Sequence, residues 1–128
     1  MKYYIETQLN SSFDEAVNKI KSHLSEFGFG AVTEMDLDQK FKEKLGIESK
    51  RYKIIGICSP KDAYDAIQLE PLIGTMLPCN IVVRETNPDK THVSAINPAF
   101  AMSAIGNQQL NIVADKIGNR LKQLIESL

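Results

Sequence analysis

Two cysteine side chains, Cys58 and Cys79, are the residues of this sequence best suited to chemistry. Cys58 stands directly before Ser59-Pro60, a pair typical of the first turn of a helix. The positive end of a helix favours a thiolate over a thiol, so Cys58 is a candidate nucleophile or redox sensor. Cys79 follows Pro78 at the start of an apolar run. The commonest fate of a free cysteine is burial as a small hydrophobic side chain, and that interpretation is favoured for both.

The order of elements around the cysteines predicts that the two thiols lie far apart. Residues 51–58 read as a strand, residues 59–70 as a helix and residues 80–85 as the next strand. A strand–helix–strand unit of this length usually makes a parallel crossover, which puts Cys58 and Cys79 at opposite ends of their strands. Strands of about six residues would hold them ~20 Å apart, whereas a disulfide needs Cα atoms within about 7 Å. Only an antiparallel arrangement, with residues 72–78 turning the chain back, would bring them together.

The remaining reactive residue types form no recognisable site. His23 and His92 belong to no spaced ligand motif, and a zinc site needs three or four ligands at set spacing. A metal site could only be a composite such as Cys58, Cys79 and His92, which we do not favour. The sequence has no Gly-x-Ser-x-Gly elbow, and Gly28-Phe29-Gly30 lies between a helix and a strand, the reverse of a phosphate-binding order. We predict no metal, no cofactor and no catalytic residue, and whether the protein is an enzyme stays open.

The apolar pattern predicts one α+β domain over residues 1–128. Ser12 and Glu15 form a capping box before an apolar helical stripe that ends at Gly28. Residues 87–90, Asn-Pro-Asp-Lys, are typical of the turn in a hairpin. The expected order is strand (3–9), helix (12–27), strand (29–35), short helix (36–46), strand (51–58), helix (59–70), strand (80–85), strand (91–96), short helix (97–104) and long C-terminal helix (110–128). These elements predict a mixed five-stranded β-sheet covered by helices.

Composition argues against two classes of partner. The 15 Lys and Arg residues and the 16 Asp and Glu residues nearly cancel, to a net charge of −1, whereas a duplex-binding protein usually shows a basic face. No window approaches the ~18 apolar residues that a membrane span needs, and the first residues lack the apolar core of a signal peptide. We therefore expect a cytoplasmic protein that keeps its two thiols reduced and binds neither nucleic acid nor membrane.

Several segments together resemble the domain of unknown function family 302, a group of small bacterial and archaeal α+β domains. The resemblance runs from the first helix to about Asn97-Pro98. It is carried by Phe27-Gly28-Phe29-Gly30, Asp36-Leu37, Lys44-Leu45-Gly46 and residues 52–60, and above all by residues 70–83, with their Gly-x-x-Leu-Pro-Cys run. The resemblance implies a homodimer, and the family pattern includes both cysteine positions. The family has no agreed enzymatic activity, and the resemblance assigns no catalytic base, nucleophile or cofactor to this chain.

Three functions are consistent with the sequence. The favoured one is a homodimeric small-ligand-binding module without catalysis, because a Gly- and Pro-punctuated apolar segment with a few polar amides suits a pocket. Its candidate ligand-binding residues are Cys58, Ser59, Gly74, Met76, Pro78 and Cys79. The alternative is a thiol-dependent redox or metal-binding protein that uses Cys58 and Cys79. The third is a dimeric structural protein whose terminal helix contributes Val113, Ile117, Leu121, Leu124 and Leu128 to the interface, although such a stripe more often covers its own sheet.

Overall fold

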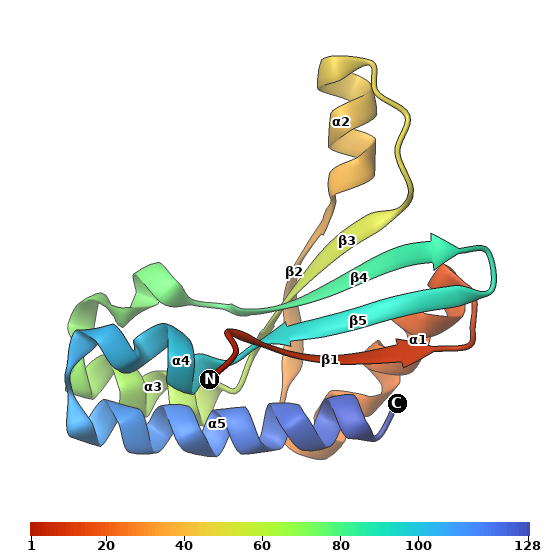
Figure 1. The fold of residues 1–128 in the computed structure, drawn as a ribbon. Helices are drawn as coiled ribbons and strands as arrows, with labels where there is room; N and C mark the ends of the chain where they lie inside the picture. The colour runs from red at the N-terminus through yellow and green to blue at the C-terminus, as the bar shows by residue number, and fades with distance from the viewer.

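A computed structural model describes all residues, 1–128, and its centre is one five-stranded sheet (Figure 1). The strands are β1 (Tyr4–Leu9), β2 (Gly30–Asp36), β3 (Tyr52–Cys58), β4 (Cys79–Asn87) and β5 (Lys90–Ile96). They lie in the order β1-β5-β4-β3-β2, and every neighbouring pair is antiparallel. The predicted α+β class and the five strands are confirmed. The prediction of a mixed sheet, with a parallel crossover between the third and fourth strands, is wrong.

The connection between β3 and β4 explains this error. Helix α3 (Pro60–Leu69) leaves the end of β3, and the 3-10 helix η2 (Pro71–Met76) then brings the chain back to the same end of the sheet. Ile73 of η2 is buried in a small apolar cluster with Ala66 of α3 and with residues of the last two helices. Burial of Ile73 anchors the returning segment beside α3, so β4 starts where β3 ends.

Two helices cover one face of the sheet and bury the main core. They are α1 (Phe13–His23) and α5 (Gln108–Glu126). Ser12 caps α1 as expected: its Oγ accepts from the backbone N–H of Glu15 at 3.3 Å. Leu121 and Leu124 of α5 are fully buried in the main cluster. The apolar stripe of α5 therefore packs inside its own chain, which argues against this stripe as a subunit interface.

The remaining helices add no fully buried residue to this main core. The short helix α4 (Pro98–Met102) and the 3-10 turn η3 (Ser103–Ile105) lead into α5, and another 3-10 turn, η1 (Ser25–Phe27), follows α1. Helix α2 (Leu37–Leu45) stands away from the rest of the molecule on the extended ends of β2 and β3, as Figure 1 shows. No helix combines the length and the hydropathy needed to cross a bilayer.

Candidate functional site

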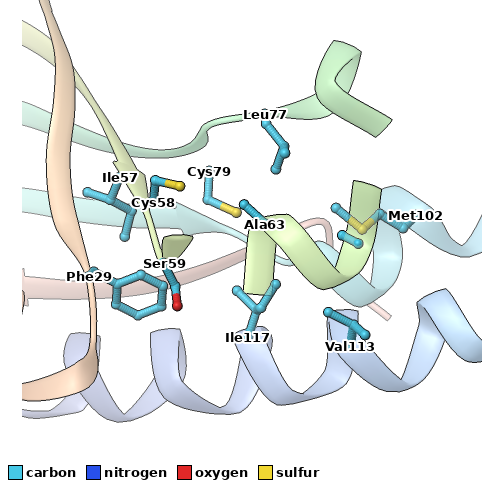
Figure 2. A pocket seen from close by; sticks show the side chains of 11 residues that line it. Phe29, Ile57, Cys58, Ser59, Ala63, Leu77, Cys79, Met102, Val113 and Ile117 are labelled. Carbon is cyan, nitrogen blue, oxygen red and sulfur yellow. The ribbon is translucent and has the colours of Figure 1, made fainter. Parts of the chain in front are cut away.

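A small apolar cavity lies at the end of the sheet where β3 ends and β4 begins (Figure 2). Its volume is about 20 Å³, which is room for about one water molecule. Ten of its eleven lining residues are hydrophobic. The eleven lining residues come from both strands, from helices α3, α4 and α5, and from the segments that connect elements: Phe29, Ile57, Cys58, Ser59, Ala63, Ala66, Leu77, Cys79, Met102, Val113 and Ile117. The walls of the cavity are therefore assembled from segments far apart in the sequence.

Both cysteines line this cavity, and Figure 2 shows their sulfur atoms directed into it from neighbouring strands. In the register of β3 with β4, Ile57 is the partner of Cys79, so Cys58 lies one residue beyond that pair. The expected separation of ~20 Å, which rested on a parallel crossover, is wrong for this topology. Both thiols are free, with Cys58 partly exposed and Cys79 buried. Joint chemistry of the two thiols requires them to be close together, and the order of elements along the sequence predicts the opposite.

The buried thiol is held in its neutral form. Burial, and secondarily a charge on the neighbouring Cys58, raise the pKa of Cys79 to about 11 from the ordinary 9.0. The apolar walls cause this shift because they offer a thiolate little of the solvation that water would give. Cys79 is therefore a poor nucleophile at neutral pH on its own. A partner that brings positive charge into the cavity would favour its deprotonation.

A polar cluster supports the wall of the cavity at Ser59. The Ser59 side chain makes no capping bond to the backbone of α3; its hydroxyl instead donates to Asp62 Oδ2 at 2.7 Å. Asp62 is buried and forms an ion pair with Arg120 of α5. Arg120 also donates to the carbonyl oxygen of Phe27 at 3.1 Å and lies over the ring of Phe29, 5.1 Å from its centroid. Two cavity-lining residues, Ser59 and Phe29, are thereby fixed to α3 and α5.

This cluster could not be predicted as a unit from local sequence patterns. Asp62 is recognisable in the sequence as a carboxylate that suits the start of a helix, whereas nothing in the local sequence singles out Arg120. Their pairing depends on how α3 and α5 pack, which local pattern does not specify. Gly28 is the one related signal: it has φ +81°, and a Cβ there would lie 2.9 Å from Arg120 Nη1.

The apolar segment after α3, residues 72–78, contributes fewer residues to the cavity than the sequence predicts. Leu77 lines the cavity, whereas Gly74, Met76 and Pro78 are not among the lining residues. Gly74 and Met76 are exposed. Pro78 packs over Gly56 of β3, where an added Cβ would approach Pro78 Cγ to 2.6 Å. Of the six candidate residues, the structure brings together Cys58, Ser59 and Cys79. Met102 and Val113 complete the opposite wall. Val113 belongs to the apolar stripe of the terminal helix, but no local pattern placed either residue near the cysteines.

The histidines lie elsewhere. His92 faces a separate shallow groove on the sheet, where its Nε2 is 2.7 Å from Glu6 Oε1. His23 Nδ1 is 2.9 Å from Ser127 Oγ. The composite of Cys58, Cys79 and His92 is not formed, since His92 is absent from the cavity lining. No group of three or more His, Cys, Asp or Glu side chains is positioned to hold a metal ion.

Comparison with known proteins gives a family and a fold. The family model described as "Domain of unknown function DUF302" matches residues 5–128. A similar solved structure is the crystal structure of an uncharacterized conserved protein DUF302 from Bacillus stearothermophilus, with 23% identity, 98% of each chain covered and a TM-score of 0.91. At this identity the likeness shows the fold alone. No curated protein matches the chain.

Proposed function

On the premise that this chain belongs to the DUF302 family, we propose that it is a homodimeric small-ligand-binding module without catalysis, and that its ligand occupies the cavity at the end of β3 and β4. The observation that carries the proposal is the presence of two free thiols in one apolar cavity. Cysteines that serve only as packing residues are expected to be closely surrounded rather than to line a void, because close packing is the usual state of a protein interior. Reduced thiols also suit a cytoplasmic location.

The size of the cavity limits the ligand. Drug-sized molecules occupy pockets of about 300–1,000 Å³, and the cavity measures about 20 Å³. The ligand is therefore one atom or a few atoms, unless α3 or α4 moves. The nearly wholly apolar lining excludes a hydrated ion as the bound species, since burial without hydrogen-bond partners is costly for polar groups.

Access to Cys79 tests whether the cavity is a site or a sealed packing defect. In the Cys58→Ala variant, Cys79 is the only thiol left to react with methyl methanethiosulfonate. We expect labelling at a rate independent of low urea concentrations, because a binding site must open locally. A labelling rate that rises with urea as steeply as global unfolding would refute the proposed site.

A blocking variant sharpens this test. Ala63 lines the cavity from α3, and Ala63→Leu would fill part of the void. We expect it to slow labelling of Cys79 at least tenfold. Gln68→Leu, at an exposed position of the same helix, is the matched control and should leave the rate unchanged.

A second candidate function, thiol–disulfide redox chemistry, is favoured by the placement of Cys58 and Cys79 on neighbouring strands. With an organic hydroperoxide as oxidant, the Cys58 thiolate would attack the terminal peroxide oxygen, release an alcohol and become a sulfenic acid. The Cys79 thiol would then form the S–S bond and release water. The two sulfurs together lose two electrons, which reduce the peroxide. One equivalent of cumene hydroperoxide should remove two hydrogen atoms from the protein mass, and accumulation of a sulfenic or sulfinic acid at Cys58 would oppose this function.

The homodimer is supported by the exposed edge of the sheet. β2 pairs only with β3, and its residues are exposed along nearly all of its length. Val32 and Met35 are exposed there, together with Leu45 and Ile47 around the end of α2. An edge strand can pair with the same strand of a second copy about a two-fold axis, which satisfies its free backbone groups. Such pairing would place a second copy of the chain beside Val32 and Met35 on β2.

A further inference from the structure

We propose that Cys58 and Cys79 together bind one Cu(I) ion in the cavity, with the two sulfur atoms as its ligands. This inference rests on the proposed ligand-binding function, because it names the class of ligand for the same site. Cu(I) is a soft monovalent cation. It would arrive bound to other sulfur ligands and exchange from them onto the two cysteines.

The dimensions of the cavity favour a single ion over an organic ligand. A volume of about 20 Å³ accepts one water-sized sphere, and two thiols enter that space from adjacent strands (Figure 2). A lone metal atom between two sulfurs needs no more room than this. No organic molecule larger than a few atoms fits without movement of the surrounding helices.

The chemistry of the lining selects the metal. Soft sulfur ligands favour Cu(I), whereas Mg²⁺ and Ca²⁺ require several oxygen ligands. The cavity supplies no carboxylate or imidazole, and its single hydroxyl, that of Ser59, already donates to Asp62. Zinc sites are almost always four-coordinate, and two thiols satisfy only half of that set. Two sulfurs are enough for an ion that accepts low coordination numbers.

Binding is balanced by the release of two protons. Cu⁺ and two thiols give a bis-thiolate complex of net charge −1 and two H⁺, with no change in the oxidation state of copper or sulfur. The positive charge of the ion lowers the cost of ionising a thiol among apolar walls. Cys58 also directly precedes the N-cap of α3, a ten-residue helix. The positive end of that helix favours the remaining negative charge.

Anaerobic competition against a chromogenic Cu(I) chelator tests the inference. We expect one Cu(I) per chain, with binding weakened at least 100-fold in Cys58→Ala and in Cys79→Ala. Met102→Leu removes the remaining sulfur of the lining at similar volume, and it should change the affinity less than twofold. An equal loss in Met102→Leu, or unchanged binding in Cys79→Ala, would overturn the two-thiol site.

The pH dependence gives an independent readout. Each proton displaced on binding makes the apparent affinity rise with pH, by up to tenfold per pH unit, so coordination by thiolates predicts tighter binding at higher pH. A flat profile would contradict coordination by both thiolates. If Cys79→Ala fails to fold, protection of Cys79 in the wild type replaces it: Cu(I) should block labelling by methyl methanethiosulfonate, and Mg²⁺ should not.

Failure of this inference is distinguishable from failure of the proposed function. Local labelling of Cys79 together with no Cu(I) binding would leave a ligand site and remove the metal. Labelling only through global unfolding would remove the site itself.

Discussion

Arg120 of α5 forms an ion pair with Asp62 in the first turn of α3, and Asp62 is almost wholly buried. This pair joins two of the three helices that line the thiol cavity. Asp62 also accepts the Ser59 hydroxyl at 2.7 Å, and Arg120 donates to the Phe27 carbonyl at 3.1 Å. The cluster therefore connects three segments of the chain, the start of α3, the turn η1 and helix α5, around one buried carboxylate.

Removal of Arg120 should destabilise the fold. Arg120→Leu leaves the Asp62 charge buried without its partner, and breaking a buried pair costs up to 3–5 kcal/mol; partial exposure of the Arg120 side chain reduces this to about 2 kcal/mol. Urea unfolding followed by circular dichroism would measure the change. Lys122→Met, which removes an exposed ion pair with Glu126 on the same helix, is the matched control. It should shift stability by at most about 0.5 kcal/mol, and an equal effect of the two variants would contradict this account.

Substitutions at Gly28 and Gly46 distinguish the cost of backbone strain from the cost of steric crowding. Gly28 and Gly46 both have left-handed φ, +81° and +66°, but only at Gly28 would a Cβ meet another group, Arg120 Nη1. Gly46→Ala should cost about 1 kcal/mol from backbone strain alone. Gly28→Ala should cost at least about 1 kcal/mol more, because Arg120 must shift from its partners. Thermal unfolding of both variants tests this prediction. Equal losses of stability would show that the Arg120 side chain moves aside without cost.

The raised pKa of Cys79 predicts a loss of stability in alkali. Its folded pKa, about 11, exceeds the ordinary value of 9.0, so the unfolded chain releases this proton at lower pH than the folded chain. The contribution of the neutral thiol is complete below about pH 9 and is lost as pH rises through the folded pKa. Between about pH 8 and pH 11 the wild type should lose about 2 kcal/mol relative to Cys79→Ala. Urea midpoints of both proteins across this range measure the difference, which a normally titrating thiol would leave constant.

The proposed pairing of two copies through β2 predicts how the proposed homodimer would be disrupted. Val32 is 58% exposed on β2, and Ile112, on α5, is 63% exposed. Val32→Lys places a charge on the edge strand, a change that opposes strand pairing between copies. We expect it to convert the dimer to a monomer in light scattering, whereas Ile112→Lys should leave the dimer intact. A monomeric wild type, or a dimeric Val32→Lys protein, would remove β2 from the interface.

Local sequence chemistry predicted the elements better than their arrangement. Ser12 with Glu15 marked the start of α1, and Gly46 marked the end of α2, because caps depend on a few neighbouring residues. The pairing of β3 with β4 could not be read in this way. Whether a helical connection crosses over or returns depends on which residues become buried, here Ile73 of η2. The apolar residues of η2 do not indicate by themselves which segment they pack against.

The candidate site was recoverable only in part for the same reason. Cys58, Ser59 and Cys79 were identifiable from residue type and neighbours along the chain. Met102 and Val113 reach the cavity through the packing of α4 and α5, and Arg120 finds Asp62 through the packing of α5 on α3. These contacts join residues separated by about half the chain, so no local pattern contains them.

The assembly of the cavity from distant segments has a consequence for biosynthesis. Val113 and Ile117 belong to the last helix, so the cavity wall is incomplete until α5 has left the ribosome. At about 5–20 residues per second, both sulfurs stay open to the surrounding solution for seconds on every newly made chain. A nascent polypeptide is thus the form in which these thiols are most vulnerable to oxidants and most accessible to metal.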